Sequence, residues 1–190
     1  MCPNPPQGDL KSMKIYPSVS QVLKPWQSPW VKEEDMIRGA RRHCAYAAYL
    51  IGGWAPSVDP RDEGQFKSFC GWVDAHVLEV WFVEKKFTDE CHGYSGTIDF
   101  GGILDFYPEG AILDWKPPSA LTPVYMAQLA AYERLAKKHG FDVVQSGFLR
   151  PDPEGGVARV DWMQGREELA FSAFLSCLNC HRYFNQGKEA

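Results

Sequence analysis

Ionisable side chains stand inside a stretch that otherwise has the composition of buried strands, GYSGTIDFGGILDFYPEGAILDWKPPS at residues 93–119. They are Asp99, Asp105, Asp114 and Lys116. Burying an unpaired charge costs several kcal/mol, so buried ionisable groups are normally paired, bound to a metal ion or shifted in pKa. A fold built on this stretch therefore has to bring partners to these side chains.

The same stretch contributes two strands to a larger α/β pattern. Runs rich in β-branched and aromatic residues predict five strands, at residues 77–87, 96–106, 110–116, 143–150 and 156–162. Helical segments come before, between and after them. We therefore expect residues 15–190 to form one α/β domain, with a central mixed sheet of four to five strands flanked by α-helices.

Capping signals and apolar periodicity place the helices. Ser18 and Gln21 have capping-box spacing before a short helix that Pro25 ends, and Thr122 and Gly140 frame the clearest helix of the chain. Further helices are predicted at residues 34–51, 65–76 and 165–184. The helix at 34–51 has an apolar stripe of Ile37, Ala40, Cys44, Ala47 and Ala48.

Composition excludes several classes of protein. At 190 residues with 45% hydrophobic residues, the chain is long and apolar enough for a folded core. No apolar run approaches the ~20 residues that span a bilayer, and residues 1–14 predict a flexible leader without a signal-peptide core. We therefore expect a cytoplasmic protein. A net charge of −4 argues against coating of nucleic acid, but it is compatible with an acidic metal site.

The residue pair Asp114 and Lys116 suggests a chemistry. The two stand two positions apart on one predicted strand, so their side chains leave the same face. A carboxylate that binds a divalent cation beside an ammonium that orients water or stabilises phosphate charge suits phosphodiester hydrolysis. Asp99 supplies a second oxygen ligand, and Gln128 and Tyr132 share one face of the following helix.

A histidine and three arginines precede this pair on the first long helix. His43 is a candidate metal ligand, because imidazole binds divalent metals. Arg38, Arg41 and Arg42 are candidate phosphate contacts, although a charge run is most often a solvated helix face.

The order and spacing of these motifs resemble the PD-(D/E)XK nuclease superfamily, and within it the RecB-like exonucleases of the small phage type. The resemblance covers roughly residues 15–150. It implies a restriction-endonuclease-like core. The matching segments are PSVSQVL (17–23), RGARRH (38–43), GYSGTID (93–99), ILDWK (112–116) and QLAAY (128–132).

Roles for individual residues follow from the resemblance. Lys116 would be the catalytic lysine, Gln128 would position that lysine or the water, and Tyr132 would lie near or touch the DNA backbone. Glu84 matches a frequent acid of the family. The implied ligands of Mg²⁺ or Mn²⁺ are His43, Asp99, Asp114 and the carbonyl of Trp115.

The activity implied is that of a metal-dependent DNA exonuclease in phage-type recombination, replication or repair. It would act on linear single- or double-stranded ends, with a single-strand annealing or binding protein as a possible partner, in the cytoplasm of the cell or of a phage's host. Pro117 departs from the Thr or Ser that often follows the family lysine. Only Cys177 and Cys180 fall late in the chain, so no iron–sulfur cluster is expected.

The register of the central hairpin decides the second carboxylate. A symmetric turn at residues 107–110 puts Ile103 opposite Asp114, which leaves Asp99 ~13 Å away along the strand. A turn nearer Phe106–Tyr107, or a distortion at Gly101–Gly102, would bring the two acids together. Otherwise Asp105 takes the place of Asp99.

Three other interpretations stay open. The same site could serve a structure- or sequence-specific endonuclease. The fold could belong to a nucleic-acid-binding accessory protein that hydrolyses nothing. Cys177, Cys180 and His181, with Cys91 and His92, could instead make a zinc-binding interaction module.

Overall fold

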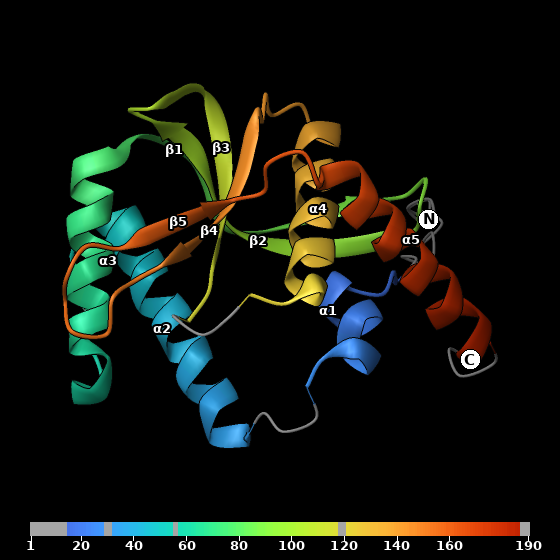
Figure 1. The fold of residues 1–190 in the computed structure, drawn as a ribbon, viewed down its shortest axis with the longest axis horizontal. Coiled ribbons are helices and arrows are strands. Elements are labelled where there is room, and N and C mark those ends of the chain that lie inside the picture. The colour runs from blue at the N-terminus through green and yellow to red at the C-terminus, as the bar shows by residue number, and fades with distance from the viewer. Residues whose placement is uncertain (1–14, 29–31, 55–56, 118–120, 187–190) are drawn as a thin grey trace, which may run out of the picture.

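The computed structural model describes residues 15–28, 32–54, 57–117 and 121–186, so the predicted leader at 1–14 lies outside the described residues. Five strands form a single sheet in the order β1-β2-β3-β4-β5, flanked by helices (Figure 1). The elements are α1 (Val19–Leu23), η1 (Lys24–Trp26), α2 (Glu33–Gly52), η2 (Pro60–Asp62), α3 (Glu63–His76), β1 (Val77–Asp89), β2 (Tyr94–Leu104), β3 (Tyr107–Trp115), α4 (Pro123–Lys138), β4 (Gln145–Arg150), β5 (Arg159–Trp162) and α5 (Glu167–Phe184).

The sheet is mixed, which confirms the predicted fold class. β1, β2 and β3 form an antiparallel meander, and β4 pairs antiparallel with β5. β3 and β4 are parallel, so the chain has to cross one face between them, and α4 makes that crossover. No helix in the described part of the chain has the length and apolar character needed to cross a membrane.

Helices cover both faces of the sheet. In Figure 1, α2 and α3 lie on one side of the sheet, and α1, α4 and α5 lie on the other. Apolar side chains fill the space between each helical layer and the sheet. Ile98, Ile112 and Phe148 belong to the core beneath α1, α4 and α5, whereas Leu113 and Trp115 belong to the core beneath α2 and α3.

The capping box at the start of α1 is confirmed. The Ser18 hydroxyl accepts a hydrogen bond from the Gln21 amide at 3.2 Å, and the Gln21 side chain accepts one from the Ser18 amide at 2.8 Å. One face of α1 is covered: Val19 and Val22 have no exposed surface. The short helix thereby joins the core beneath α4 and α5.

The apolar stripe predicted on α2 does not face the core. Ile37 is 48% exposed and Cys44 is exposed, while the buried residues of the helix are Ala45 and Tyr46. The ring of Tyr46 stacks on Phe69 of α3 with centroids 4.0 Å apart. Burial of a large aromatic ring removes far more apolar surface from water than burial of a single alanine, so the packing of Tyr46 favours the observed rotation of the helix.

The hairpin turn lies earlier than the sequence suggested. The prediction of a turn at 107–110 is wrong, because the turn falls at 105–106 and Leu104 pairs with Tyr107. Between that pair and the Gly102–Ala111 pair, β2 advances from 102 to 104 and β3 from 107 to 111. The extra residues on β3 form a bulge, and the corrected register pairs Phe100 with Leu113.

Gly102 provides the close approach that this distortion needs. A Cβ there would lie 2.2 Å from the carbonyl oxygen of Glu79 on β1, and one on Gly101 would lie 2.2 Å from the ring of Phe82. The pairing of β1 with β2 is also irregular between Val80 and Phe82. β1 and β2 therefore approach each other at a point where only a residue without a side chain fits.

We expect Gly102→Ala to lower the free energy of unfolding by about 1–3 kcal/mol, because the new methyl group meets backbone that cannot rotate away. Chemical denaturation measures this. Gly71→Ala is the matched control: nothing lies within 4 Å of its Cβ position, so the change should stabilise α3 by about 0.5–1 kcal/mol. Equal stability of the two variants would contradict the role given to Gly102.

Candidate metal and catalytic centre

The centre forms where β2 and β3 part. Their backbone pairing is last seen at Phe100–Leu113. Two residues beyond Leu113, the amide of Trp115 donates a 2.7 Å hydrogen bond to Oδ2 of Asp99, whose side chain is only 7% exposed. The Asp99 carboxylate thus accepts the hydrogen bond that a backbone carbonyl of a partner strand would otherwise accept. This bond holds Asp99 beside the segment that carries Asp114.

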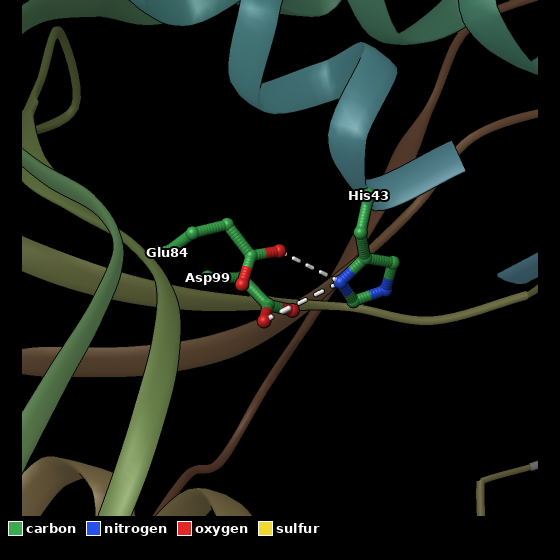
Figure 2. A group of neighbouring side chains, drawn as sticks. All are labelled: His43, Glu84 and Asp99. Carbon is green, nitrogen blue, oxygen red and sulfur yellow. Dashed lines mark hydrogen bonds and ion pairs between the residues drawn. The ribbon is translucent and has the colours of Figure 1, made fainter. Parts of the chain in front are cut away.

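Asp99 belongs to a group of three ligand-type side chains. His43 Nδ1 lies 3.1 Å from Oε1 of Glu84 and 3.5 Å from Oδ1 of Asp99, and the ligand atoms of all three lie within 4.8 Å of one another. Figure 2 shows the imidazole reaching from its helix toward the two carboxylates. One imidazole and two carboxylates can hold a divalent metal ion.

Glu84 is held in a strained backbone conformation. Among the described residues it is the only non-glycine with a positive φ, 47°. Val83 pairs with Phe100 and Lys85 with Ile98, so Glu84 stands across from Asp99. A left-handed conformation costs a bulky residue roughly 1–2 kcal/mol and is concentrated at functional sites. The strain accompanies a side chain that points at the candidate metal ligands.

The electrostatics of the group favour a cation. Burial lowers the pKa of His43, but the charges and hydrogen bonds of Asp99 and Glu84 outweigh burial and raise the pKa to about 10. The metal-free centre therefore holds a proton on His43. The same carboxylates would also stabilise a metal ion that replaced this proton on the imidazole.

Asp114 is the most deeply buried acid of the centre. Its side chain is 1% exposed, and its Oδ2 forms an ion pair with Nζ of Lys116 at 2.6 Å, whereas Oδ1 is buried without a hydrogen-bond partner. Burial raises the pKa of Asp114, and this effect is stronger than the opposing pull of Lys116. A buried carboxylate oxygen without a donor leaves room for a cation as its partner.

Lys116 connects the acids to α4. Its Nζ donates a 3.2 Å hydrogen bond to Oε1 of Gln128, and Nε2 of Gln128 donates a 3.0 Å bond to the hydroxyl of Tyr132. Burial lowers the pKa of Lys116, but the charges of Asp114 and Asp99 outweigh it and raise the pKa above its ordinary value. The structure therefore brings Lys116, Gln128 and Tyr132 into one chain of contacts.

A cleft of about 670 Å³ opens over the centre. The residues that line it from α2 include Arg38, Arg42, His43 and Tyr46, and the other lining residues include Trp115, Lys116, Pro117 and Tyr125. Arg38 and Arg42 are already engaged there. Arg38 Nε and Nη2 donate to the buried Asp62 at 2.9 and 2.6 Å, and Arg42 Nη1 donates to Gln65 at 2.7 Å.

Two of the predicted substrate contacts do not line this cleft. Arg41 lines a separate cavity with Ile37 and Ala40. Tyr132 is only 4% exposed, so in this structure it supports Gln128 from beneath. Of the predicted phosphate contacts, Arg38 and Arg42 are the ones that the fold brings to the cleft.

The competing metal sites find no support among the described residues. Asp105 lies in the turn, 41% exposed, with its carboxylate 3.2 Å from His76, far along β2 from the centre. Cys177 and Cys180 stand three apart on α5, and neither joins His181, Cys91 or His92 in a group of metal-ligand spacing within the described parts of the chain. The roles of Asp114 and of the Trp115 carbonyl as ligands stay predictions.

A comparison of the chain with protein-family models found no match, and a comparison with curated proteins found none either.

The strain at Glu84 can be measured by comparing two truncations. Glu84→Gly and Glu84→Ala both remove the carboxylate, but only glycine accepts a φ of 47° without cost, so we expect the glycine variant to be more stable by about 1 kcal/mol. Denaturant unfolding measures the difference. At the exposed Lys86 of the same strand the order should reverse, with alanine more stable than glycine. Alanine being the more stable at position 84 as well would refute the strain.

Metal binding should displace the proton of His43. Because the metal-free pKa is about 10, affinity for Mn²⁺ should rise with pH between 6.5 and 8.5, by up to about tenfold per unit. Titration calorimetry in buffers of different ionisation enthalpy measures both the affinity and the released proton. His43→Gln should bind more weakly and without this proton release. An affinity that does not change with pH would show that His43 is not a ligand.

Proposed function

We propose that this protein is a divalent-metal-dependent deoxyribonuclease, and we favour an exonuclease over an endonuclease. The observation that supports it most strongly is the pairing of Lys116 with the buried Asp114, whose Oδ1 has no hydrogen-bond partner, next to the His43, Glu84 and Asp99 group. His43 and Lys116 both line one cleft, and the acids contact these two side chains. Phosphodiester hydrolysis uses this combination.

The donor set fits a hard or borderline cation such as Mg²⁺ or Mn²⁺. The carboxylates of Glu84, Asp99 and Asp114, the imidazole of His43 and the carbonyl of Trp115 would hold it. When bound, the cation supplies positive charge that stabilises the negative charge developing on the phosphate oxygens. Neither a thiolate nor a second imidazole belongs to the group, which disfavours a structural zinc site.

Lys116 would act on the reacting groups themselves. Hydrolysis joins the oxygen of a water molecule to phosphorus and breaks the bond to the leaving oxygen, which takes up a proton. The Lys116 ammonium lines the cleft and can donate hydrogen bonds to the attacking water or to a phosphate oxygen. Gln128 holds the ammonium in place from the other side.

The substrate would be DNA, with phosphates contacted along α2. Arg38 and Arg42 line the same cleft as Lys116, and Asp62 holds the Arg38 guanidinium in its orientation. Action on linear ends, a role in phage-type recombination, replication or repair, a single-strand annealing or binding protein as partner, and a cytoplasmic location all rest on the resemblance of the motifs to RecB-like exonucleases. A structure- or sequence-specific endonuclease would use the same centre.

The decisive experiment is digestion of end-labelled linear and circular DNA, single- and double-stranded, with Mg²⁺, Mn²⁺ or EDTA. We expect wild type to shorten linear DNA only, and EDTA or Lys116→Ala to reduce the rate at least a hundredfold, because the charge at the reacting phosphate is then lost. Lys24→Ala, at an exposed lysine of η1, is the control and should keep the wild-type rate.

Each other outcome has a definite meaning. Cutting of circular DNA that depends on Lys116 would replace the exonuclease with an endonuclease. No hydrolysis with either metal, while DNA is still retained in a binding assay, would refute the catalytic function and leave a nucleic-acid-binding accessory protein.

A further inference from the structure

Lys116 has an aromatic neighbour outside the motifs described so far. Its Nζ lies 4.7 Å from the centroid of the Tyr125 ring. Tyr125 stands in the first turn of α4, one turn before Gln128, and its ring is partly buried against the core while it lines the cleft. An ammonium within about 6 Å of a ring centroid is attracted by the negative face of the ring.

The ring of Tyr125 can hold the Lys116 ammonium when Asp114, another partner of that ammonium, binds a metal ion. Lysine has a long flexible stem, so its position depends on what surrounds the ammonium. Here the surroundings are Asp114 Oδ2 at 2.6 Å, Gln128 Oε1 at 3.2 Å and the ring. If Asp114 binds a metal ion, its attraction for Lys116 weakens, and Gln128 and Tyr125 are left to fix the ammonium.

A ring also differs from a polar partner in the number of N–H donors of the ammonium that it occupies. Gln128 takes up one N–H donor of the ammonium, whereas an aromatic face attracts the charge without requiring a directed hydrogen bond. N–H groups of Lys116 then stay available to a water or a phosphate oxygen. The hydroxyl of Tyr125 has no hydrogen-bond partner within the described residues. The contact between Tyr125 and the Lys116 ammonium is therefore made by the aromatic ring.

We propose that Tyr125 is a positioning residue for the hydrolysis: its ring fixes the Lys116 ammonium on the cleft wall while leaving donors free for the substrate. This inference rests on the nuclease function proposed above. It predicts that the aromatic ring, not the hydroxyl, is required, and that its loss affects turnover more than substrate binding.

The kinetic test compares Tyr125→Leu with Tyr125→Phe on linear DNA in Mn²⁺. We expect leucine to lower kcat about five- to thirtyfold with KM changed less than about threefold, which is the range that a desolvated cation–π contact supplies. Phenylalanine, which keeps the ring, should restore most of that loss. Tyr125→Met, of similar bulk, should behave like leucine, and thermal unfolding confirms that each variant is folded. Tyr183→Leu, at a 67% exposed tyrosine of α5, is the control.

A second measurement needs neither DNA nor metal. In protein labelled with ¹³C at the lysine ε-carbons, the Lys116 resonance, identified by its loss in Lys116→Arg, should be displaced by the ring current of Tyr125. The displacement should persist in Tyr125→Phe and disappear in Tyr125→Leu.

The outcomes separate the two proposals. Active wild type with an unchanged kcat in Tyr125→Leu, or a Lys116 resonance that does not respond to the ring, overturns the role of Tyr125 and leaves the nuclease intact. A KM that rises with kcat unchanged would make Tyr125 a substrate contact instead, which also overturns it. Wild type that hydrolyses no DNA removes the nuclease, and the positioning role with it.

Discussion

The hydrogen bond from the Trp115 amide to Asp99 is the contact on which the centre depends. It forms where backbone pairing of β2 and β3 gives way, and it spans the gap with a side chain instead of a strand. The indole of Trp115 meanwhile packs against His43 and Tyr46 of α2. One residue thus ties Asp99, the Asp114 segment and the histidine helix together, and the aromatic core beneath α2 and α3 sets the geometry of the polar site.

Charge balance explains why so many ionisable groups tolerate this depth. Without a cation, the acids are compensated from two sides: a protonated His43 faces Glu84 and Asp99, and Lys116 faces Asp114. The compensation is incomplete, because Oδ1 of Asp114 is buried without a hydrogen-bond partner. Buried carboxylates in that state favour the arrival of positive charge. An under-satisfied acid beside the His43, Glu84 and Asp99 group is what the proposed metal site would require.

The sequence predicted the parts of the site that depend on local periodicity. Gln128 and Tyr132 had to share a face because they stand four apart on a helix, and Asp114 and Lys116 because they stand two apart on a strand. The choice between Asp99 and Asp105 depended on a bulge, which arises from contacts between three strands and leaves no periodic signal. The predicted rotation of α2 is wrong for a related reason. The stacking of Tyr46 on Phe69 decides which face of the helix is buried, and the alanine-rich stripe does not.

Glu84 and the hairpin bulge point to a shared constraint. The sheet is irregular on both sides of β2: β1 shifts register near Phe82, just before the strained Glu84, and β3 carries its extra residues after Tyr107. A regular meander would place other residues beside Asp99 and align none of these acids with His43. The glycines at 101 and 102 let the neighbouring strands come close enough to distort. Irregular strand pairing usually weakens a sheet. Here it brings the candidate ligands of β1, β2 and α2 together beside Asp114 of β3 and Lys116, which follows that strand.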